Sequence, residues 1–385
     1  MSVVSSVPSK LPDIGTSIFA VMTRLANERG AINLSQGFPD FDCDPALVAA
    51  VTRAMEAGHN QYAPMPGVPA LRQAIADKVR HCYGATVDAE TEVLVTSGAT
   101  AGLYATLTAL VQPGDEVVLF EPCYDSYVPV IRLSGGVPVF VTLPYPDYTV
   151  DWDAVRRAVT PRTRLILVNT PHNPSGRIWT ADDMRQLAAL VDGTDILIVA
   201  DEVYEHIVFD GRRHESLLRQ PELRRRTVAI SSFGKTYHTT GWKVGYCVAP
   251  APLLREVTRI HQFVTFTVHT PSQVALAEFV AADPAASTLA GFYQAKRDRF
   301  LALTAGLPLK PLACEGTYFQ LMDYSAVSSR GDREMAEWLI ETHGVATIPV
   351  SAFLYKDTGG PVLRFCFAKR DETLAAAAAR LEALA

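Results

Sequence analysis

The sequence predicts an α/β protein, with a large domain built on a mostly parallel sheet flanked by helices and a smaller α+β domain. Between about residues 90 and 250, short apolar runs alternate with helical stretches, which is the pattern of strands covered by helices on both faces. After about residue 285 this alternation stops. The length of 385 residues is enough to give each part a core of its own.

Six apolar runs are expected to be strands of the large sheet. They are EVLVTS (92–97), EVVLFEP (116–122), TRLILVNTP (163–171), DILIVAD (195–201), TVAISS (227–232) and VGYCVAP (244–250). Ligands of such sheets bind beyond the carboxyl ends of the strands. Polar residues stand at or near four of these ends, namely Ser97, Asn169, Asp201 and Ser232. We therefore expect the functional site along this edge.

The C-terminal part is expected to form the smaller domain. It contains a long helix near 285–305, the segment EGTYFQLMDY (315–324), an amphipathic helix, the run VLRFCFA (362–368) and an alanine-rich terminal helix. We expect the N-terminal segment to join it. The predicted division is a large domain of residues 46–285 and a small domain of residues 1–45 together with 286–385.

Composition argues against several classes of partner. The net charge of −6 disfavours nucleic acid and anionic membranes as partners.

The six cysteines never form C-x-x-C, and His172, His238 and His269 lack metal-ligand spacing, so we expect neither a metal site nor a disulfide framework. The N-terminal MSVVSSVPSK does not resemble a signal peptide and no apolar run is long enough to span a membrane. A soluble, unprocessed cytoplasmic protein is expected.

The segment SSFGKTY (231–237) contains Gly-Lys-Thr, which also closes the phosphate-binding P-loop G-x-x-x-x-G-K-[ST]. With Gly234 as the second glycine of that motif, the first should stand at position 229. That residue is Ala229, inside a predicted strand, so nucleotide binding is the weaker interpretation. Taken alone, Lys235 is then either a surface lysine or a nucleophilic amine.

Two neighbours of Lys235 favour the nucleophilic amine. An aldehyde cofactor with a phosphate needs a lysine for the aldehyde, and hydroxyl and cationic donors for the phosphate. Ser232 and Lys243 could supply those donors. The stretch SFGKTYHTTGWKVG (232–245) resembles the lysine region of fold-type-I aminotransferases of class I/II, which use pyridoxal 5′-phosphate (PLP).

The resemblance covers nearly the whole chain. Its other motifs are INLSQGFPDF (32–41), NQYAPMPGVPALR (60–72), NTPHNPSG (169–176), DEVYEHI (201–207) and LRFCFAK (363–369). Within the class, the sequence is most similar to methionine aminotransferases and to the kynurenine/glutamine aminotransferase group. The resemblance implies the PLP-dependent transferase fold of type I, with a seven-stranded type of sheet. It also implies ping-pong transfer of an amino group from an amino acid to a 2-oxo acid.

The resemblance implies a phosphate site near Lys235, the catalytic lysine. TSGATAGLY (96–104) reads as a strand end, a glycine turn and a helix start, where free amides and the helix dipole attract an anion. Taken alone, this segment is equally well explained as an ordinary capped helix. The implied phosphate contacts are the amides of Ala99 and Thr100, the side chains of Ser232 and Lys243, and Tyr62 reaching in from a second subunit.

Four further residues are implied to contact the cofactor ring. Asp201 would pair with the protonated pyridine nitrogen, although a helix cap or a metal-binding carboxylate would explain it equally well alone. Tyr204 and Asn173 would hydrogen-bond the phenolic oxygen; Asn173 also suits a turn before proline. Tyr124 would stack on the ring, whereas an isolated aromatic after a strand is more often part of a core.

The implied substrate residues begin with Arg364, which lies in an apolar run and needs an anionic partner there. Its planar fork suits an α-carboxylate, and a structural salt bridge is the alternative. By resemblance, Asn173 and the backbone of Gly37 would bind the same substrate, and Phe19 would line the pocket. Phe266 would reach in from the neighbouring chain, so a homodimer is implied.

The substrate class follows from an absence in the sequence. Dicarboxylate-specific relatives carry a second arginine near HQFVTFTVHTPSQ (261–273), and this stretch contains none. Methionine or another neutral or aromatic amino acid is therefore expected as donor. A β-lyase acting on cysteine conjugates, or kynurenine/glutamine transaminase activity, in the same site remains an alternative. An effector-sensing half of a transcription regulator is disfavoured, because only about thirty residues precede INLSQGF.

Overall fold

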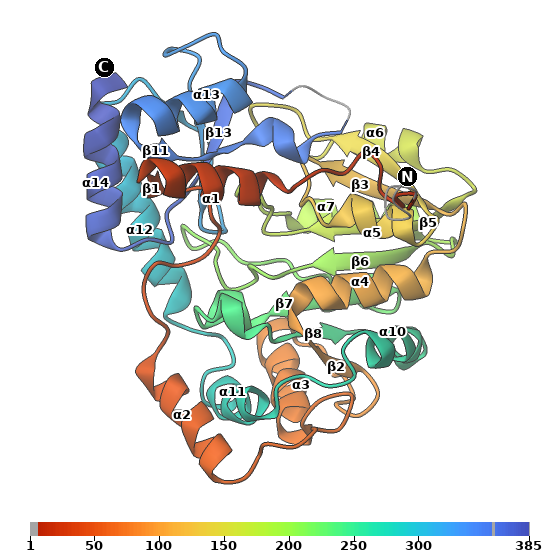
Figure 1. Ribbon diagram of the computed structural model, residues 1–385. Coiled ribbons are helices and arrows are strands. Elements are labelled where there is room, and N and C mark those ends of the chain that lie inside the picture. Colours follow the sequence, from red (N-terminus) through yellow and green to blue (C-terminus); the bar gives the residue numbers. More distant parts are fainter. Residues whose placement is uncertain (1–6, 356–358, 385) are drawn as a thin grey trace.

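The large sheet has seven strands in the order β2-β8-β7-β6-β5-β3-β4 (Figure 1). The computed structural model describes residues 7–355 and 359–384. The strands are β2 (Val93–Thr96), β3 (Glu116–Glu121), β4 (Val137–Thr142), β5 (Thr163–Asn169), β6 (Leu197–Asp201), β7 (Thr227–Ser232) and β8 (Gly245–Val248). β8 runs antiparallel to both of its neighbours, β2 and β7, and the other described pairings of this sheet are parallel. The predicted mostly parallel α/β sheet is confirmed, and all six predicted strands are present.

Helices cover both faces of this sheet because alternate strand residues bury apolar side chains on either side. On one face lie α4 (Gly98–Leu110), α5 (Tyr127–Leu133) and α10 (Ala251–Val264), whose Leu107 and Val257 share a core with Leu119. On the other face lie α6 (Trp152–Ala158) and α7 (Ala181–Val191), whose Val155 and Leu187 pack with Ile166. The strands are thereby withdrawn from water except at their ends.

A third group of helices packs beside the β2–β8 edge of the sheet. It comprises α2 (Pro45–Glu56), α3 (Pro69–Tyr83) and α11 (Thr270–Ala282), and short helices α8 (Pro221–Arg224) and α9 (Phe233–Thr236) lie before and after β7. Leu47, Ile75 and Leu276 share one apolar cluster with Val95 of β2. This group of helices covers the edge of the sheet formed by β2 and β8.

Strand β4 was not among the predicted strands. It pairs with β3 at the edge of the sheet, and most of its side chains are partly exposed. Its sequence VPVFVT carries Pro138, which cannot donate a ladder hydrogen bond and is tolerated at an edge. Pro138 and the partial exposure of most of its side chains distinguish β4 from the six continuous, buried apolar runs.

The smaller sheet has the order β12-β13-β10-β9 and is antiparallel. Its strands are β9 (Lys310–Pro311), β10 (Phe319–Asp323), β12 (Ile348–Pro349) and β13 (Val362–Cys366), and the helices around it are α1 (Ile18–Arg29), α12 (Leu289–Thr304), α13 (Asp332–Trp338) and α14 (Asp371–Leu381). β1 (Ile32–Asn33) pairs in parallel with β11 (Val345–Ala346). Met22, Ala26 and Leu34 from the start of the chain therefore lie in the same core as Phe365.

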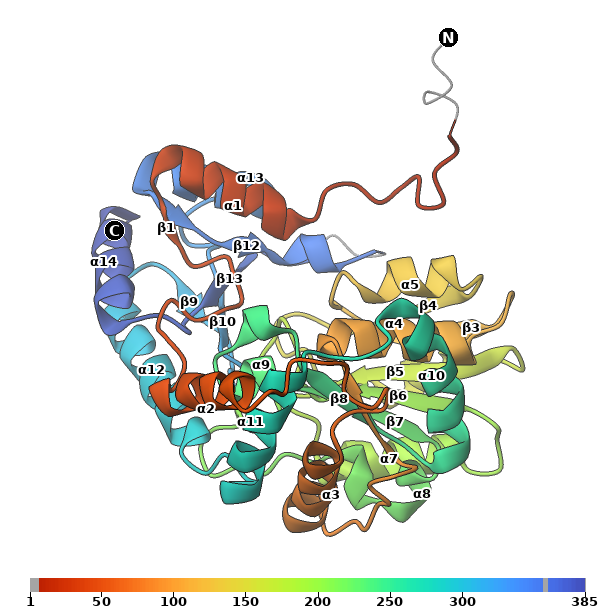
Figure 2. The same cartoon turned by 60° about the horizontal axis from the view of Figure 1, so that its bottom comes forward.

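Residues 7–17 extend away from the body of the molecule before α1 begins (Figure 2). Most of their side chains are exposed. Across residues 7–355 and 359–384, none of the helices is long and apolar enough to cross a membrane.

Candidate active site

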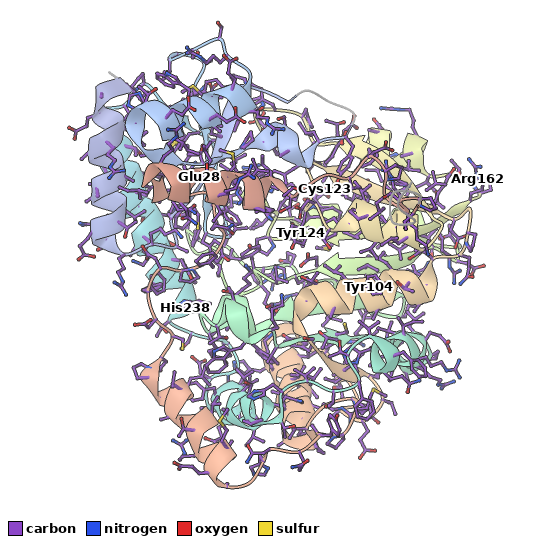
Figure 3. All side chains as sticks on the ribbon, viewed as in Figure 1. Glu28, Tyr104, Cys123, Tyr124, Arg162 and His238 are labelled. Atoms are coloured by element: carbon purple, nitrogen blue, oxygen red, sulfur yellow. The ribbon has the colours of Figure 1, made fainter. Side chains whose placement is uncertain are left out.

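A pocket opens where the carboxyl ends of β5, β6 and β7 meet the start of α4. Its lining is Ala99, Thr100, Leu103, Tyr124, Tyr127, Asn169, Asn173, Asp201, Val203, Tyr204, Ser232, Lys235, Thr240 and Lys243. In Figure 3, Tyr124 lies near the middle of the molecule, whereas Arg162 lies at the far end of the sheet. Nine residues expected to contact a cofactor thus line one pocket at the predicted edge.

One end of the pocket is built to receive an anion. Gly98 begins α4 with a φ of 72°, and the preceding Ser97 makes no side-chain cap, so the first amides of the helix are left for another acceptor. A Cβ at Gly98 would lie 3.2 Å from Nζ of Lys243, which places this ammonium at the helix start. Among the described residues Lys243 has no ion-pair partner.

Gly245 lets β8 approach α4 closely. A Cβ at this position would lie 2.7 Å from the carbonyl oxygen of Ser231 and 2.8 Å from the amide nitrogen of Ala99. No side chain fits there without moving backbone. The hydrogen side chain of Gly245 therefore sets the distance between the helix start and the end of β7, where Ser232 lies.

Lys235 lies on α9, one short turn beyond β7, and its side chain is partly buried. Its Nζ donates to the hydroxyl of Tyr318 at 2.7 Å and to the carbonyl of Gly37 at 3.1 Å. Burial lowers the pKa of this amine to about 8, and the nearby charges of Arg364 and Lys243 act in the same direction. A lysine with a pKa near neutrality is suited to nucleophilic attack and to proton transfer.

Asp201 is the last residue of β6 and points into the pocket. Its carboxylate accepts hydrogen bonds from the Tyr127 hydroxyl at 2.6 Å and from the Val203 amide at 3.3 Å. Burial raises its pKa to about 6, although the bond from Tyr127 opposes the rise. Among the residues that the structure describes, Asp201 forms no ion pair, and a buried carboxylate of this kind is suited to binding a positively charged ligand atom.

Asn173 and Tyr204 are brought to the same pocket from two loops that follow β5 and β6. The amide oxygen of Asn173 accepts from Arg364 at 2.7 Å, so its NH₂ group is directed elsewhere and can donate to a ligand. The ring of Tyr204 is buried edge-on against Tyr318, with centroids 5.1 Å apart. Both side chains can therefore offer a donor to one ligand oxygen.

Arg364 lies in β13 and is 1% exposed. Besides Asn173, its guanidinium donates to the carbonyl of Ser35 at 3.0 Å, and its buried Nε has no partner among the described residues. It lies 3.8 Å from the ring centroid of Phe319, with the rings of Phe19 and Phe353 also near. No carboxylate of the described chain forms an ion pair with it, so the guanidinium is available to an anionic ligand.

The donor set fits a planar cofactor that carries a phosphate. The pocket lining combines helix amides, a hydroxyl and an ammonium with a buried carboxylate and a lysine amine. These are the groups that PLP needs for its phosphate, its ring nitrogen and its aldehyde. In the described part of the chain, no cluster of three or more His, Cys, Asp or Glu side chains could hold a metal ion.

Five of the predicted site residues are not part of the pocket lining: Arg364, described above, and Tyr62, Phe266, Phe19 and Gly37. Tyr62 is 81% exposed and packs edge-on against Phe266, which is 49% exposed, beside a separate groove. Phe19 lies near Arg364 instead, 5.8 Å from the ring of Phe353. Gly37 contacts the site through its carbonyl, which accepts from Lys235 and Tyr318.

The sequence did not identify Tyr127, Thr240 and Tyr318 as site residues. Tyr127 follows Tyr124 by three residues at the start of α5, a spacing that could have placed both on one side of a helical turn. Tyr318 stands in the motif EGTYF, but nothing in that motif shows that it meets a lysine more than eighty residues away.

The fold and this pocket together define a PLP-dependent transferase of fold type I. The chain belongs to the family "Aminotransferase class I and II", whose model matches residues 29–381. It is 51% identical to methionine aminotransferase of Escherichia coli, over 98% of each chain. It is 32% identical to human kynurenine–oxoglutarate transaminase 3, over 98% of this chain and 90% of that one.

Solved structures show the same likeness. The structure of E. coli YbdL, described as having a methionine aminotransferase function, has a TM-score of 0.96 at 50% identity and covers 98% of this chain and 99% of its own. N-succinyldiaminopimelate aminotransferase of Mycobacterium tuberculosis has a TM-score of 0.95 at 40% identity, with 99% and 100% covered. The protein is thus a PLP-dependent aminotransferase, and the P-loop interpretation of Gly-Lys-Thr is wrong.

Proposed function

We propose that this aminotransferase takes its amino group from methionine or another neutral or aromatic amino acid. The observation that carries the proposal is the apolar surrounding of Arg364, formed by the rings of Phe19, Phe319 and Phe353. A second carboxylate would have to lose water there without a cation to pair with. The relative at 51% identity, which is a methionine aminotransferase, supports the same donor.

In the proposed reaction, Arg364 binds the α-carboxylate of the amino acid. Its Nη1 is oriented by Asn173 and its Nη2 by the carbonyl of Ser35, so the guanidinium plane is fixed before the substrate arrives. The backbone of Gly37 and the side chain of Asn173 complete this substrate contact. A fixed plane lets two parallel N–H groups meet the two carboxylate oxygens.

Lys235 moves the proton. Bound PLP supplies the aldehyde that exchanges the amino group and a ring that withdraws electrons from the substrate Cα. The amine of Lys235, with a pKa of about 8, would accept the Cα proton and hold it for transfer. Asp201 would hold a positive charge at the ring nitrogen, Tyr204 and Asn173 would bind the phenolic oxygen, and Tyr124 would pack on the ring. Ala99, Thr100, Ser232 and Lys243 hold the phosphate.

We further propose a homodimer in which each site is completed by Tyr62 and Phe266 of the other chain. Both are exposed in the single chain, and Phe263 nearby is 86% exposed. Exposed aromatic side chains in one patch are typical of an interface. The proposal includes a cytoplasmic location and a division into a large domain of residues 46–285 and a small domain of residues 1–45 with 286–385.

The experiment is to compare donors with purified protein loaded with PLP. Methionine, phenylalanine, kynurenine, N-succinyldiaminopimelate and aspartate are each offered with a 2-oxo acid, and kcat/KM is measured. We expect methionine to exceed aspartate by at least about a hundredfold, the penalty of leaving a buried charge unpaired. A better rate with aspartate or with the succinylated donor would overturn the substrate class.

Lys235→Ala is the accompanying test of the lysine. This variant should lose transamination altogether. The other lysine in the pocket lining is Lys243, which is assigned to the phosphate and so cannot replace Lys235. Normal turnover by Lys235→Ala would overturn the assignment. Release of pyruvate from a cysteine conjugate without any 2-oxo acid would show the β-lyase reaction instead.

A further inference from the structure

The amine of Lys235 has a partner that the reaction described so far does not use. Its contact with the Tyr318 hydroxyl, at 2.7 Å, is shorter than its contact with the carbonyl of Gly37, at 3.1 Å. Tyr318 stands just before β10, and Gly37 follows β1, so both come from segments packed with the smaller sheet. Lys235, in the proposed large domain, is therefore held by two groups that belong to the proposed small domain.

The direction of these hydrogen bonds follows from the chemistry of the three groups. The carbonyl of Gly37 can only accept, so the hydroxyl of Tyr318, which also contacts it, gives its proton to Gly37. The lone pairs of the hydroxyl are then left for Lys235, which donates. An acceptor in this position favours the ammonium form of the lysine, whereas burial favours the neutral amine.

The Tyr318 ring is fixed on several sides. It is fully buried, with the rings of Tyr204, Tyr293 and Phe319 at centroid distances of 5.1, 5.5 and 4.9 Å. The preceding Thr317 has a φ of 67°, a left-handed conformation that is costly for a β-branched residue. This conformation is held by a hydrogen bond from the Thr317 amide to the Ile207 carbonyl at 3.0 Å.

The same short segment also supports the carboxylate-binding arginine. Phe319, the next residue, lies under the guanidinium of Arg364 at 3.8 Å. On the facing segment, Ser35 accepts from Arg364 and Gly37 accepts from Lys235. The two segments thus hold the arginine and the lysine in one fixed relation.

We propose that Tyr318 is a positioning residue for Lys235: its hydroxyl receives the lysine amine whenever that amine is not bonded to the cofactor and holds it, with the Gly37 carbonyl, beside the pocket. This inference rests on the proposed role of Lys235. The Tyr318 hydroxyl makes and breaks hydrogen bonds in this role, and forms no covalent bond. Without the hydroxyl, the amine is free to take other rotamers, and the fraction of time it is aimed at the substrate falls.

The test compares Tyr318→Phe with Tyr293→Phe. Tyr293 is an apt control because it belongs to the same buried ring cluster and its hydroxyl has no hydrogen-bond partner among the described residues. Both variants keep the ring and lose one oxygen. Thermal melting of both proteins checks that each remains folded.

The first readout needs no cofactor. The apoprotein is labelled with an amine-specific reagent, trinitrobenzenesulfonate, over a range of pH, and the adduct on Lys235 is quantified by peptide mapping. The other groups that act on this amine, namely Asp201, Arg364, Lys243 and Cys366, are present in both variants, as is the Tyr204 ring, whose centroid lies 5.6 Å from Nζ. We expect the labelling midpoint of Tyr318→Phe to fall by about one pH unit, since an acceptor of the ammonium is lost. Tyr293→Phe should match the wild type.

The second readout is the methionine half-reaction of the loaded enzyme. The limiting rate of Tyr318→Phe should fall about tenfold or more, with the dissociation constant of methionine changed less than about threefold. An unchanged midpoint together with an unchanged rate would overturn the proposal. If the wild type itself fails with methionine, the substrate proposal fails, but the labelling result still decides the role of Tyr318.

A third measurement requires only the wild-type protein and so does not depend on the folding of any variant. In a crystal structure with pyridoxamine phosphate, the form of the cofactor in which the lysine is free, Nζ of Lys235 should lie within hydrogen-bond distance of the Tyr318 hydroxyl. An amine directed away from Tyr318 in that complex would overturn the proposal.

Discussion

Asp201 and Lys235 have pKa values shifted toward each other by the same cause. Burial raises the pKa of the Asp201 carboxyl to about 6 and lowers that of the Lys235 amine to about 8. In the folded protein, Asp201 binds its proton more tightly than in the unfolded chain. Its ionised form therefore costs stability at pH 7, and this cost disappears as the pH falls from about 6 toward 3.8. A cation beside the ionised Asp201 carboxylate also reduces this cost in stability, because it pairs with the negative charge.

Asp201→Asn should separate stability from function. The apoprotein of this variant is expected to resist urea better than the wild type at pH 7, with the advantage shrinking at pH 5, because the wild-type carboxyl then takes up its proton. Its half-reaction with methionine should be at least about a hundredfold slower, since the amide places no negative charge at the ring nitrogen. Urea unfolding and stopped-flow absorbance measure the two effects.

The control for this variant is Asp195→Asn, which removes an exposed carboxylate just before the same strand. It should leave both quantities unchanged. A half-reaction of Asp201→Asn within tenfold of the wild-type rate would contradict the role given to this carboxylate.

Among individual residues, those that stand in a recognisable short motif could be predicted from the sequence. Lys235, Asp201 and Asn173 stand in short motifs at strand ends, and the structure places them in one pocket. Tyr318 could not be predicted, because its role depends on how the segment before β10 packs against α9. A tyrosine in an apolar run looks the same whether its hydroxyl meets a lysine or nothing, as Tyr293 shows.

The segment after β6 carries site residues on one side and a buried ion pair on the other. Glu205, one residue after Tyr204, accepts hydrogen bonds from Lys78 of α3 at 2.6 Å and from Tyr246 of β8 at 2.8 Å. Tyr83 and Ser231 also donate to it. One carboxylate thereby ties this segment to α3, β7 and β8. The interactions with Lys78 and Ser231 hold the pKa of Glu205 low despite its burial.

Lys78→Met should be strongly destabilising, because it leaves a buried carboxylate without its cation. We expect the free energy of unfolding to fall by about 3–5 kcal/mol, measured with urea. The double variant Lys78→Met/Glu205→Leu should recover part of this loss, since no charge is then left unpaired.

Arg80→Met on the same helix provides the comparison. Its pair with Asp77 has side chains 65% and 41% exposed, so its removal should change the free energy of unfolding by no more than about 1 kcal/mol. Equal effects of Lys78→Met and Arg80→Met would show that Glu205 does not depend on its lysine.

Gly245→Ala should weaken cofactor binding. The added methyl group meets the amide of Ala99 and the carbonyl of Ser231, so the start of α4 or the end of β7 must shift. We expect the dissociation constant of PLP for the apoprotein to rise about tenfold, equivalent to about 1.4 kcal/mol, measured by fluorescence titration. Gly241→Ala, where a Cβ meets no atom within 4 Å, should bind PLP normally. Equal affinities would show that this close approach does not shape the phosphate site.

Elements were predictable where their pattern is strong. The six buried strands are continuous apolar runs, and the structure contains all of them. The pattern fails for β4, which is an edge strand with a proline, and for the two-residue strands β1, β9, β11 and β12. Such strands form because the surrounding packing places them side by side, and their own residues carry no period to detect.

At the scale of the whole molecule, an aromatic patch is formed by the exposed rings of Tyr62 and Phe266, which pack edge-on, together with exposed Phe263 three residues before Phe266 in the chain. Phe263 is 86% exposed and Val264 beside it is 47% exposed. Exposure of these apolar side chains to water is unfavourable for a single chain. This patch is the surface on which we expect a second copy to pack.

Phe263→Asp should therefore separate the subunits. Sedimentation is expected to show a dimer for the wild type and a monomer for the variant, because a charge in a buried apolar contact is costly. Transamination per chain should fall at least about tenfold, since Tyr62 of the partner is then lost from each site. Leu133→Asp, which changes a 42% exposed leucine on α5, should leave the mass and the activity unchanged. A monomeric wild type with full activity would contradict the shared site.

The pairing of β1 with β11 joins residues from nearly opposite ends of the chain, Ile32 with Val345. During synthesis, the ribosome releases α1 and β1 long before β10, β11 and β13 exist. The large sheet, whose strands lie between Val93 and Val248, can assemble in that interval, whereas Met22 and Leu34 must wait with their apolar side chains uncovered. With the role proposed for Arg364, the site is complete only after β13 has emerged and Arg364 lies beside Asn173.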